Sequence, residues 1–465
     1  MRVVVCVKQS CKELNPFDAC AVEAALRIEG AEVIAVSMGR PDVEDMLKYL
    51  TRLGVSRGIL LSDRAFAGAD TLATSYALSL AVQKLRPDLV LCGRQSIDGD
   101  TAQVGPGLAA LLRMPVIPYV LEMSVTEKEA VCRTRLGDRT APLPAVLTVE
   151  RINELRFPKL RSKVGVTEVW DAEMLGADVR RCGLAGSPTK VVQSFENQSG
   201  RRHCRMISKE ELRTTVENAM KTPRVAITSA EHTKKRLPAV WAVGEKAAEK
   251  AREIADTVTV IRETDPTALL ERATREKPSV ILFDSSPESR VLAPQVAVQL
   301  QTGLCADCTK LETDGEQLFM YRPAFGGNIV AKIRCTTRPT MATVRTLEER
   351  CAELILAGGR GVIGQEEAMQ KAARAIGAQC AASRALVDAG KAPYEWQIGL
   401  TGRTVSPQVY LAVGISGAVQ HVCGMESAHT VIAVNPDKTA PIFDYADFGV
   451  CATAEEVFSL LCEEK

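Results

Sequence analysis

Short apolar runs rich in β-branched residues recur along this chain and alternate with segments of helical spacing. The first runs cover residues 2–7, 31–37, 58–61 and 88–93. Runs of this length between turn residues are typical of strands buried on both faces of a sheet. Alternation of such strands with helices predicts an α/β fold with parallel sheets covered by helices. Among these helices, we expect Asn15 and Asp70 to act as N-caps.

A later part of the chain repeats the pattern of the first. An apolar run at 279–284 leads through a polar turn into a helix, just as the run at 88–93 does. Pro294 and Pro106 hold corresponding places in the two helices, but the segment 98–100 has no counterpart. We infer two copies of one fold, of which only the first keeps a phosphate-binding loop.

The loop that follows the run at 88–93 is the first candidate binding site. A loop at the carboxyl end of a parallel strand is the usual ligand position in an open α/β sheet. Small residues in it would leave N–H groups free for a phosphate, with the Thr101 hydroxyl and the Gln103 amide as further donors. The alternative is a solvated acidic loop in which Asp100 caps the next helix.

A glycine-rich turn near the end of the chain is the second candidate. The apolar run at 409–413 breaks at Gly414, Gly417 opens a helix, and Asn435 ends the following strand. A strand that passes through glycines into a helix allows close backbone approach and presents N–H groups to an anion. A lone histidine in such a turn, here His421, is more often structural than catalytic.

The composition of the chain mainly excludes classes of protein. The chain has 465 residues, 46% of them hydrophobic and 25% charged, which is ordinary for a globular protein of several domains. A net charge of +1 argues against a dedicated nucleic-acid or membrane-surface protein. With no membrane-length apolar run, no signal peptide and 15 scattered cysteines, we expect a cytoplasmic protein. Cys305 and Cys308 form the one Cys-x-x-Cys pair but have no nearby histidine, and we expect no metal site.

Five separate segments in the last quarter of the chain occur in a characteristic order. They are 358–361 (GGRG), 383–390 (SRALVDAG), 397–402 (QIGLTG), 414–421 (GISGAVQH) and Asn435. Together they resemble the FAD-binding domain of the electron-transfer flavoprotein α subunit. In the N-terminal part, four stretches resemble the β subunit of the same family: VVVCVKQ, NPFDACAVEAAL, FAGADTLATSYAL and GRQSIDGDTAQVGP.

The resemblance implies a single chain in which the β and α subunits are fused in that order. Its fold would be two related parallel-sheet nucleotide-binding domains, of the adenine nucleotide α-hydrolase type, and a C-terminal Rossmann-like FAD-binding domain. We expect the β-like domain at 1–192, a linker at 193–236, the first α-like domain at 237–346 and the FAD-binding domain at 347–465. The basic residues of the linker are most simply interpreted as a solvated face.

The resemblance also implies the roles of residues at the FAD. Arg384 would lie over the isoalloxazine face as a fixed cation, Thr401 would bond to N5, and His421 would point at the C2 carbonyl end. Such groups raise the potential because they stabilise negative charge on the reduced ring. The remaining implied FAD contacts are Arg360, Ser383, Gln397, Ile398, Gly399, Leu400, Gly402, Ser416, Gly417, Ala418, Val419, Gln420 and Asn435.

A second nucleotide, FAD or AMP, is implied for the N-terminal domain. Cys6, Asn15 and Met38 would line its adenosine pocket. Its phosphate would lie on a loop made of Gln95, Asp98, Gly99, Asp100, Thr101, Ala102, Gln103, Val104 and Gly105. We favour FAD because this loop and residues 66–75 resemble the two-flavin branch of the family.

The chain departs from the family at three places. Leu400 stands where the family has Gln, and Thr453 stands where it has Asp. A segment usual in the β subunit is missing between Gln9 and Asn15, so the second nucleotide pocket should be shorter on one side.

The implied function is that of a soluble electron carrier rather than a conventional enzyme. Its FAD would accept electrons from a dehydrogenase, such as an acyl-CoA dehydrogenase, and pass them to another redox partner. The dehydrogenase would dock on a loop at 148–160 through an exposed Leu160. Two alternatives stay open: an electron-bifurcating enzyme that oxidises NADH with two FAD, and an adenine-nucleotide-binding protein without redox work.

Overall fold

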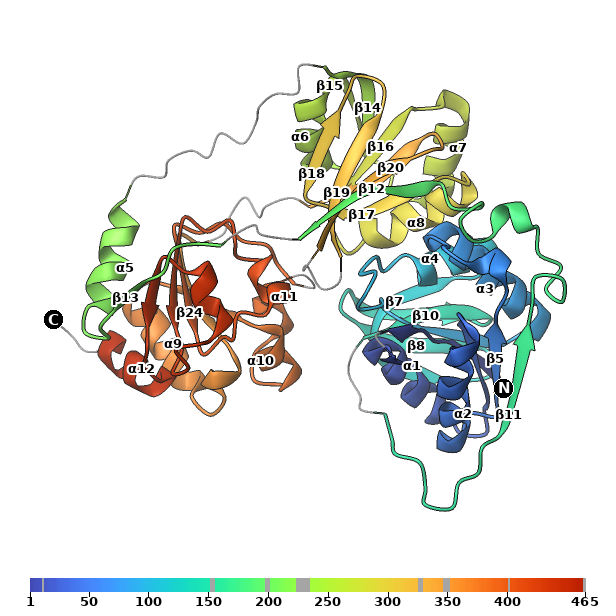
Figure 1. Ribbon diagram of the computed structural model, residues 1–465, viewed down its shortest axis with the longest axis horizontal. Coiled ribbons are helices and arrows are strands. Elements are labelled where there is room, and N and C mark those ends of the chain that lie inside the picture. The colour runs from blue at the N-terminus through green and yellow to red at the C-terminus, as the bar shows by residue number, and fades with distance from the viewer. Residues whose placement is uncertain are drawn as a thin grey trace. The chain divides into compact units, whose positions relative to one another are not determined.

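The computed structural model describes residues 1–10, 12–150, 155–196, 201–222, 235–324, 329–345, 352–399 and 402–462. The chain divides into two compact units (Figure 1). Unit 1 combines Met1–Phe195, His232–Phe325 and Val330–Arg345, and unit 2 combines Glu196–Glu231, Gly326–Ile329 and Thr346–Lys465. Several parallel sheets with intervening helices confirm the predicted α/β class.

The N-terminal part of unit 1 is built on a nine-stranded sheet in the order β11-β5-β4-β1-β6-β10-β7-β8-β9. The pairs from β11 to β7 are parallel, and β8 and β9 continue the sheet as antiparallel strands. The strands are β1 (Arg2–Cys6), β4 (Glu32–Met38), β5 (Arg57–Leu61), β6 (Leu89–Gly93), β7 (Val116–Val125), β8 (Glu129–Thr134), β9 (Gly137–Pro142), β10 (Ala145–Val149) and β11 (Val166–Trp170). A two-stranded hairpin, β2 (Gln9–Ser10) and β3 (Glu13–Leu14), follows β1.

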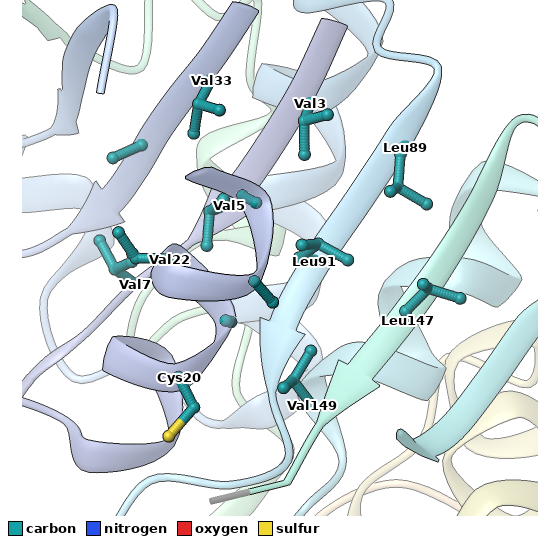
Figure 2. Close-up of a cluster of buried hydrophobic side chains, with 14 of the residues drawn as sticks. Val3, Val5, Val7, Cys20, Val22, Val33, Leu89, Leu91, Leu147 and Val149 are labelled. Carbon is teal, nitrogen blue, oxygen red and sulfur yellow. The ribbon is translucent and has the colours of Figure 1, made fainter. Parts of the chain in front are cut away.

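The helices of this part are α1 (Pro16–Leu26), α2 (Glu44–Leu53), α3 (Thr71–Leu85) and α4 (Val104–Leu112), with short 3-10 turns η1 (Pro41–Val43), η2 (Arg64–Phe66) and η3 (Val179–Arg181). They bury β1 on both faces. Val3 and Val5 pack with α1 and α2, whereas Val4 and Cys6 pack with α3 and α4. Figure 2 shows the first of these clusters, where labelled side chains of α1 lie over those of β1, β6 and β10.

The predicted elements of this part agree with the structure to within one or two residues. α3 illustrates why, because its predicted cap is present. The Asp70 carboxylate accepts hydrogen bonds from Leu72 N at 3.0 Å and Ala73 N at 3.1 Å. A side chain that pairs with these first N–H groups fixes the start of the helix.

Asn15 occupies the predicted N-cap position of α1, but its side chain makes no capping hydrogen bond, and in that respect the prediction was wrong. Its side chain instead donates to Gln95 O at 2.8 Å and accepts from Ile97 N at 3.2 Å. Pro16 occupies the first helical position, where its missing N–H and fixed φ start the helix without a cap. Asn15 is therefore free to bind a distant loop.

A second α/β body in unit 1 has a five-stranded parallel sheet in the order β15-β14-β16-β21-β17. Its strands are β14 (Leu237–Val243), β15 (Ala255–Ile261), β16 (Val280–Asp284), β17 (Leu304–Cys308) and β21 (Thr340–Val344), and its helices are α6 (Glu245–Ile254), α7 (Pro266–Glu276) and α8 (Ser289–Gln299). A further sheet joins β12 (Thr189–Glu196), β20 (Ile329–Cys335), β19 (Leu318–Ala324) and β18 (Lys310–Thr313) in that order. β1 lies between β4 and β6, and β14 lies between β15 and β16 in the same way. α4 follows β6 and α8 follows β16, so the two helices occupy equivalent places.

These two helices also join the bodies of unit 1. Gln299 of α8 donates to Ala110 O of α4 at 2.8 Å. Gly107 of α4 leaves room for Val298, which would lie 3.1 Å from a Cβ at that position. The two bodies therefore pack against each other through α4 and α8.

Unit 2 has a six-stranded parallel sheet in the order β13-β26-β25-β24-β22-β23. The strands are β13 (Arg205–Ile207), β22 (Leu354–Gly358), β23 (Gln379–Ala382), β24 (Val409–Val413), β25 (Thr430–Val434) and β26 (Phe448–Val450). The helices are α5 (Leu212–Lys221), α9 (Glu366–Ala375), α10 (Arg384–Asp388), α11 (Val419–Val422) and α12 (Ala454–Cys462), with 3-10 turns η5 (Arg360–Val362), η6 (Tyr394–Trp396) and η7 (Pro441–Tyr445).

The range 193–236, expected to be a linker, contributes β13 and α5 to this sheet and its core. β13 pairs in parallel with β26, and Leu212 and Val216 of α5 pack in the cluster that contains Phe458 of α12. Figure 1 shows both green elements beside the orange and red elements of unit 2.

The basic residues of this range are not simply a solvated face, and that interpretation was wrong for two arginines. The Arg202 guanidinium pairs with Asp447 and also donates to the carbonyls of Glu426, Ala428 and His429. Arg236 donates to carbonyls at the C-terminal end of α6, where a cation complements the helix dipole. None of the helices within the described ranges is long and apolar enough to cross a membrane.

Candidate nucleotide-binding sites

Unit 1 contains a cavity of about 1050 Å³ at the carboxyl ends of its first sheet. β1 lies between β4 and β6, so the connections that follow β1 and β6 diverge at this edge. Such a switch point is the usual ligand position in an open α/β sheet. The second α/β body closes part of the cavity with side chains of β17, β19 and β20.

The loop before α4 presents free backbone donors. No described residue accepts a hydrogen bond from the N–H groups of Thr101, Ala102 or Gln103, and α4 begins without a side-chain cap. Asp100 and Ala102 have φ values of +50° and +55°, in the left-handed region that non-glycine residues rarely adopt. Strained backbone with free N–H groups at a helix start suits a phosphate.

The structure divides the residues predicted for this site into two groups. Seven loop residues line the cavity together with Cys6 and Met38, namely Gln95, Gly99, Thr101, Ala102, Gln103, Val104 and Gly105. Asn15, Asp98 and Asp100 instead brace the loop. Asp98 pairs with Lys8 at 2.7 Å, and Asp100 accepts from Gln95 Nε2 at 3.0 Å. Asp100 therefore does not act as the cap of α4.

The Gln103 amide is partly engaged within the protein, and its Nε2 keeps a second N–H for the predicted phosphate contact. Its Oε1 accepts from Thr71 Oγ1 at 2.6 Å, and its Nε2 donates to Leu304 O at 3.2 Å. Both ends of the amide are thus used to join the loop to α3 and to β17.

Sequence reasoning missed two charged residues of the cavity. The Asp18 carboxylate accepts from Lys8 N at 2.8 Å, just after β1, and from Gly93 N at 3.1 Å, at the last residue of β6. Burial raises the pKa of Asp18 to about 7. Arg322, from β19, donates to Ala306 O at 2.9 Å and to Gly99 O of the loop at 2.6 Å. Asp18 belongs to the NPFD motif, but only tertiary contacts show that Asp18 binds the ends of two strands and that Arg322 binds the loop.

A buried ion cluster lies next to Arg322. Asp307 pairs with Arg290 at 3.1 Å and also with Arg345. Burial alone would raise the pKa of Asp307, but the charges of Arg345 and Arg290 outweigh it and hold that pKa far below its usual range. Cys305 and Cys308 are buried in the same strand, where burial raises the pKa of Cys308.

The candidate site in unit 2 lies where its strand order reverses. β22 lies between β23 and β24, and the turns that follow β22 and β24 are in direct backbone contact. Gly359 N donates to Val413 O at 2.8 Å, and Gly361 N donates to Gly414 O at 3.1 Å. A Cβ at position 359 would lie 2.1 Å from Gly414 O, so only glycine allows this approach.

The loop predicted to line the flavin approaches the same edge. Gly399, with φ +138°, would place a Cβ 2.5 Å from Gln420 O, and Gln397 and Ile398 are buried beside it. Gly417 has φ +90° and contacts the backbone of Ile442. Leu400 and Thr401 lie outside the described residues. The structure thus brings the segments 397–399 and 414–421 together.

The other predicted FAD residues differ in their exposure and bonding. Arg360, Ser416, Ala418 and Gln420 are exposed, Gly402 and Val419 are half-buried, and Arg384 is half-buried with its Nε 3.2 Å from Asp388 Oδ2. Asn435 donates to Ile415 O at 2.9 Å, which braces the turn before Ser416. Thr453 bonds to Glu456 at the start of α12.

Two buried polar atoms at this edge lack partners. Ser383 Oγ and His421 Nδ1 are inaccessible to solvent, and neither makes a well-aligned hydrogen bond with any residue the structure describes. His421 Nε2 lies 3.0 Å from Tyr410 Oη. Burial lowers the pKa of His421 to about 4, so its ring is neutral near pH 7. Orphaned polar atoms beside a glycine cradle fit a polar ligand such as FAD.

Fold and sites together define a nucleotide-binding α/β protein. Residues 3–174 and 226–368 match the family model described as the electron transfer flavoprotein domain. Residues 349–426 match the electron transfer flavoprotein FAD-binding domain. The chain belongs to the electron transfer flavoprotein family.

Relatives of both subunit kinds match the chain. It is 42% identical over 198 residues to the caffeyl-CoA reductase–Etf complex subunit CarD of Acetobacterium woodii, covering 39% of this chain and 75% of the relative. In Thermoanaerobacterium thermosaccharolyticum, the α subunit is 38% identical over 245 residues (42% of this chain, 74% of the relative). The β subunit of that organism is 40% identical over 194 residues (38% and 74%). These matches confirm the predicted β–α fusion and its role in electron transfer, and they remove the non-redox alternative.

Proposed function

We propose that this protein is a single-chain electron carrier whose FAD lies at the glycine-lined switch point of unit 2. The observation that carries the proposal is the orphaned pair Ser383 Oγ and His421 Nδ1 beside the turns of β22 and β24. Bound FAD supplies the electron-transfer chemistry. The chain holds the cofactor, with Arg360 and Ser383 at its phosphates and residues 397–402 along its ring.

Two side chains would set the electrostatics at the ring. His421 is a neutral hydrogen-bond donor, because burial keeps its pKa near 4. Arg384 contributes positive charge, which its ion pair with Asp388 partly offsets. Both stabilise negative charge on the reduced cofactor and so favour its reduction.

We further propose a second nucleotide in the cavity of unit 1, and FAD in preference to AMP. Pockets for small molecules range over roughly 300–1000 Å³, and this cavity of about 1050 Å³ has room for a dinucleotide. The free N–H groups of residues 101–103 would hold a phosphate. Arg322 adds a buried positive charge at the same loop.

A second flavin in this cavity would favour a second candidate function. With a flavin in each unit, the protein would split the two electrons of NADH between two acceptors. The simple carrier needs only the site in unit 2, so the number of bound flavins separates the two functions.

We propose that the partner dehydrogenase docks on the loop after β10. Phe157 and Leu160 are 88% and 98% exposed there. Arg156 anchors the base of the loop, since its guanidinium and backbone N–H bond to Glu23 at 2.9–3.2 Å. Residues 151–154 of the predicted loop lie outside the described residues. Because the relative CarD belongs to a caffeyl-CoA reductase–Etf complex, an acyl-CoA dehydrogenase is the partner we propose.

A cytoplasmic location completes the proposal. Every cysteine within the described ranges is a free thiol, and most are buried. Unpaired cysteines in this number are typical of a reducing compartment.

Counting the nucleotides released on denaturation tests these proposals. After saturation with FAD, we expect two equivalents of FAD, and Asp98→Ala/Thr101→Ala should remove only one, because Asp98 braces the loop through Lys8. Asp138→Ala/Thr140→Ala on the exposed strand β9 is the matched control and should keep both. One FAD with one AMP would leave the simple carrier, and no FAD at all would overturn the proposed function.

A further inference from the structure

Tyr410 and His421 form a buried pair behind the proposed flavin site. Tyr410 lies in β24 and is fully buried, and His421 lies in α11 and is 6% exposed. Tyr410 Oη is 3.0 Å from His421 Nε2, and the two rings are tilted by 54°. Among the described residues, His421 is the one hydrogen-bonding partner of this hydroxyl.

The number of unsatisfied groups decides which atom carries the hydrogen. If the phenol donates to Nε2, both of those atoms are satisfied, and only the Nδ1–H, which lies near the Ile398 backbone, lacks a well-aligned acceptor. If Nε2–H donated to the phenol instead, the phenol hydrogen and the Nδ1 lone pair would both be buried without partners. Each such group costs free energy, so the first arrangement is favoured. Burial also raises the pKa of Tyr410, which keeps its hydrogen available.

We propose that Tyr410 is a positioning residue that holds the hydrogen of His421 on Nδ1 and so presents a donor to the bound flavin. The inference rests on the proposed FAD site of unit 2 and names the residue that prepares its donor. The ring of His421 lies by the Ile398 backbone, and the backbone of His421 approaches Gly399, at the edge where the cofactor would lie. The histidine thus needs no rearrangement of its hydrogen when FAD binds.

Ring-nitrogen NMR of the full chain, before FAD is added, tests the tautomer directly. The chain has only 4 histidines, so the signals can be assigned. Near pH 7 we expect Nδ1 of His421 to be protonated and Nε2 to be an acceptor. Finding the hydrogen on Nε2 in the unaltered chain would overturn the proposal, whatever any variant does.

Tyr410→Phe should weaken the preference of His421 for the tautomer with its hydrogen on Nδ1. We expect the ratio of Nδ1–H to Nε2–H to fall about tenfold, since one buried hydrogen bond no longer favours one form. Tyr445→Phe, on the edge of the same apolar cluster, is the matched control and should change nothing. His429, which bonds to Thr430, reports whether the variants stay folded.

FAD titration supplies the second readout. If only the Nδ1–H form binds, the Kd for FAD should rise by the factor by which the fraction of that form falls, and the NMR of the two proteins gives this factor. A Kd that does not follow the measured fraction would overturn the positioning role. Absence of FAD binding in the unaltered chain would instead contradict the proposed function, while the tautomer measurement would still stand on its own.

Discussion

Arg384 is the side chain whose charge should bear most directly on the flavin potential. Its guanidinium is half-buried and paired with Asp388 at 3.2 Å. We predict that Arg384→Ala lowers the midpoint potential while FAD stays largely bound. The free energy of reduction of the flavin should change by an amount on the order of 1 kcal/mol, because solvent and the Asp388 carboxylate already screen the charge. Potentiometric titration of the bound flavin measures it.

The ion pair supplies a variant of opposite sign. Asp388→Asn removes a negative charge from beside the guanidinium and should raise the potential, whereas Arg374→Ala, at an exposed position of α9, should leave it unchanged. If the Arg384 and Asp388 variants move the potential in the same direction, the assigned role of Arg384 is wrong.

Asp18 should make stability depend on pH. Its pKa is about 7 in the folded protein and about 3.8 in an ordinary carboxyl. Between these values the folded state holds a proton that the unfolded state has lost, so its stabilising contribution falls as pH rises and is gone above pH 7. From pH 5 to pH 8, we expect Asp18 to remove on the order of 1–3 kcal/mol from the free energy of unfolding.

Denaturant unfolding at the two pH values checks this. The loss from pH 5 to pH 8 should be smaller in Asp18→Asn, which cannot ionise, and should be unchanged in Asp42→Asn at an exposed position. Equal losses in all three proteins would contradict the raised pKa of Asp18.

At the scale of elements, the exposed loop after β10 should control the encounter with a dehydrogenase. Leu160→Ala removes an apolar anchor and should slow electron transfer from the true partner roughly tenfold, as loss of an interface hot spot does. FAD content should not change. Leu184→Ala, another exposed leucine of unit 1, is the control. Equal rates for both variants would mark Leu160 as an ordinary surface residue.

Elements with a clear local pattern could be predicted from the sequence. β24 lies where its apolar run ends at Gly414, and α3 starts where Asp70 caps it. The antiparallel strands β8 and β9 and the sheet that contains β12 could not be predicted. Their order depends on pairing between segments far apart in the chain, which no local periodicity encodes.

The candidate sites were predictable in their motifs but not in their internal bonding. The loop at 95–105 could be placed at the edge of its sheet because it follows a buried strand. The side-chain amides of Asn15 and Gln103 hold this loop in place. Their contacts, with Gln95 and Leu304, span 80 and 201 residues of sequence, so no local pattern predicts them. The role of Tyr410 was hidden for a related reason, since an apolar run gives no sign that one hydroxyl meets a histidine.

At the scale of the whole molecule, the sheet of unit 2 is assembled from two stretches of chain. β13 and α5 precede β14, whereas the rest of the sheet follows β21. We predict that cleavage at a protease site inserted between Thr222 and Lys235 leaves the two fragments associated. The first fragment carries Leu212 and Val216, which fill the apolar core beside α12. Size-exclusion chromatography after cleavage measures this, and separation under native conditions would contradict it.

The same arrangement limits how this protein can be recombined. A graft of residues 347–465 onto another scaffold would lack the edge strand β13 and would uncover the apolar surface on which Leu212 and Val216 pack. A transplantable FAD cassette therefore needs two pieces of coding sequence, one from each side of the second α/β body. In this chain, the second stretch that matches the electron transfer flavoprotein domain begins at residue 226, so β13 and α5 precede it although they fold with the sheet of unit 2.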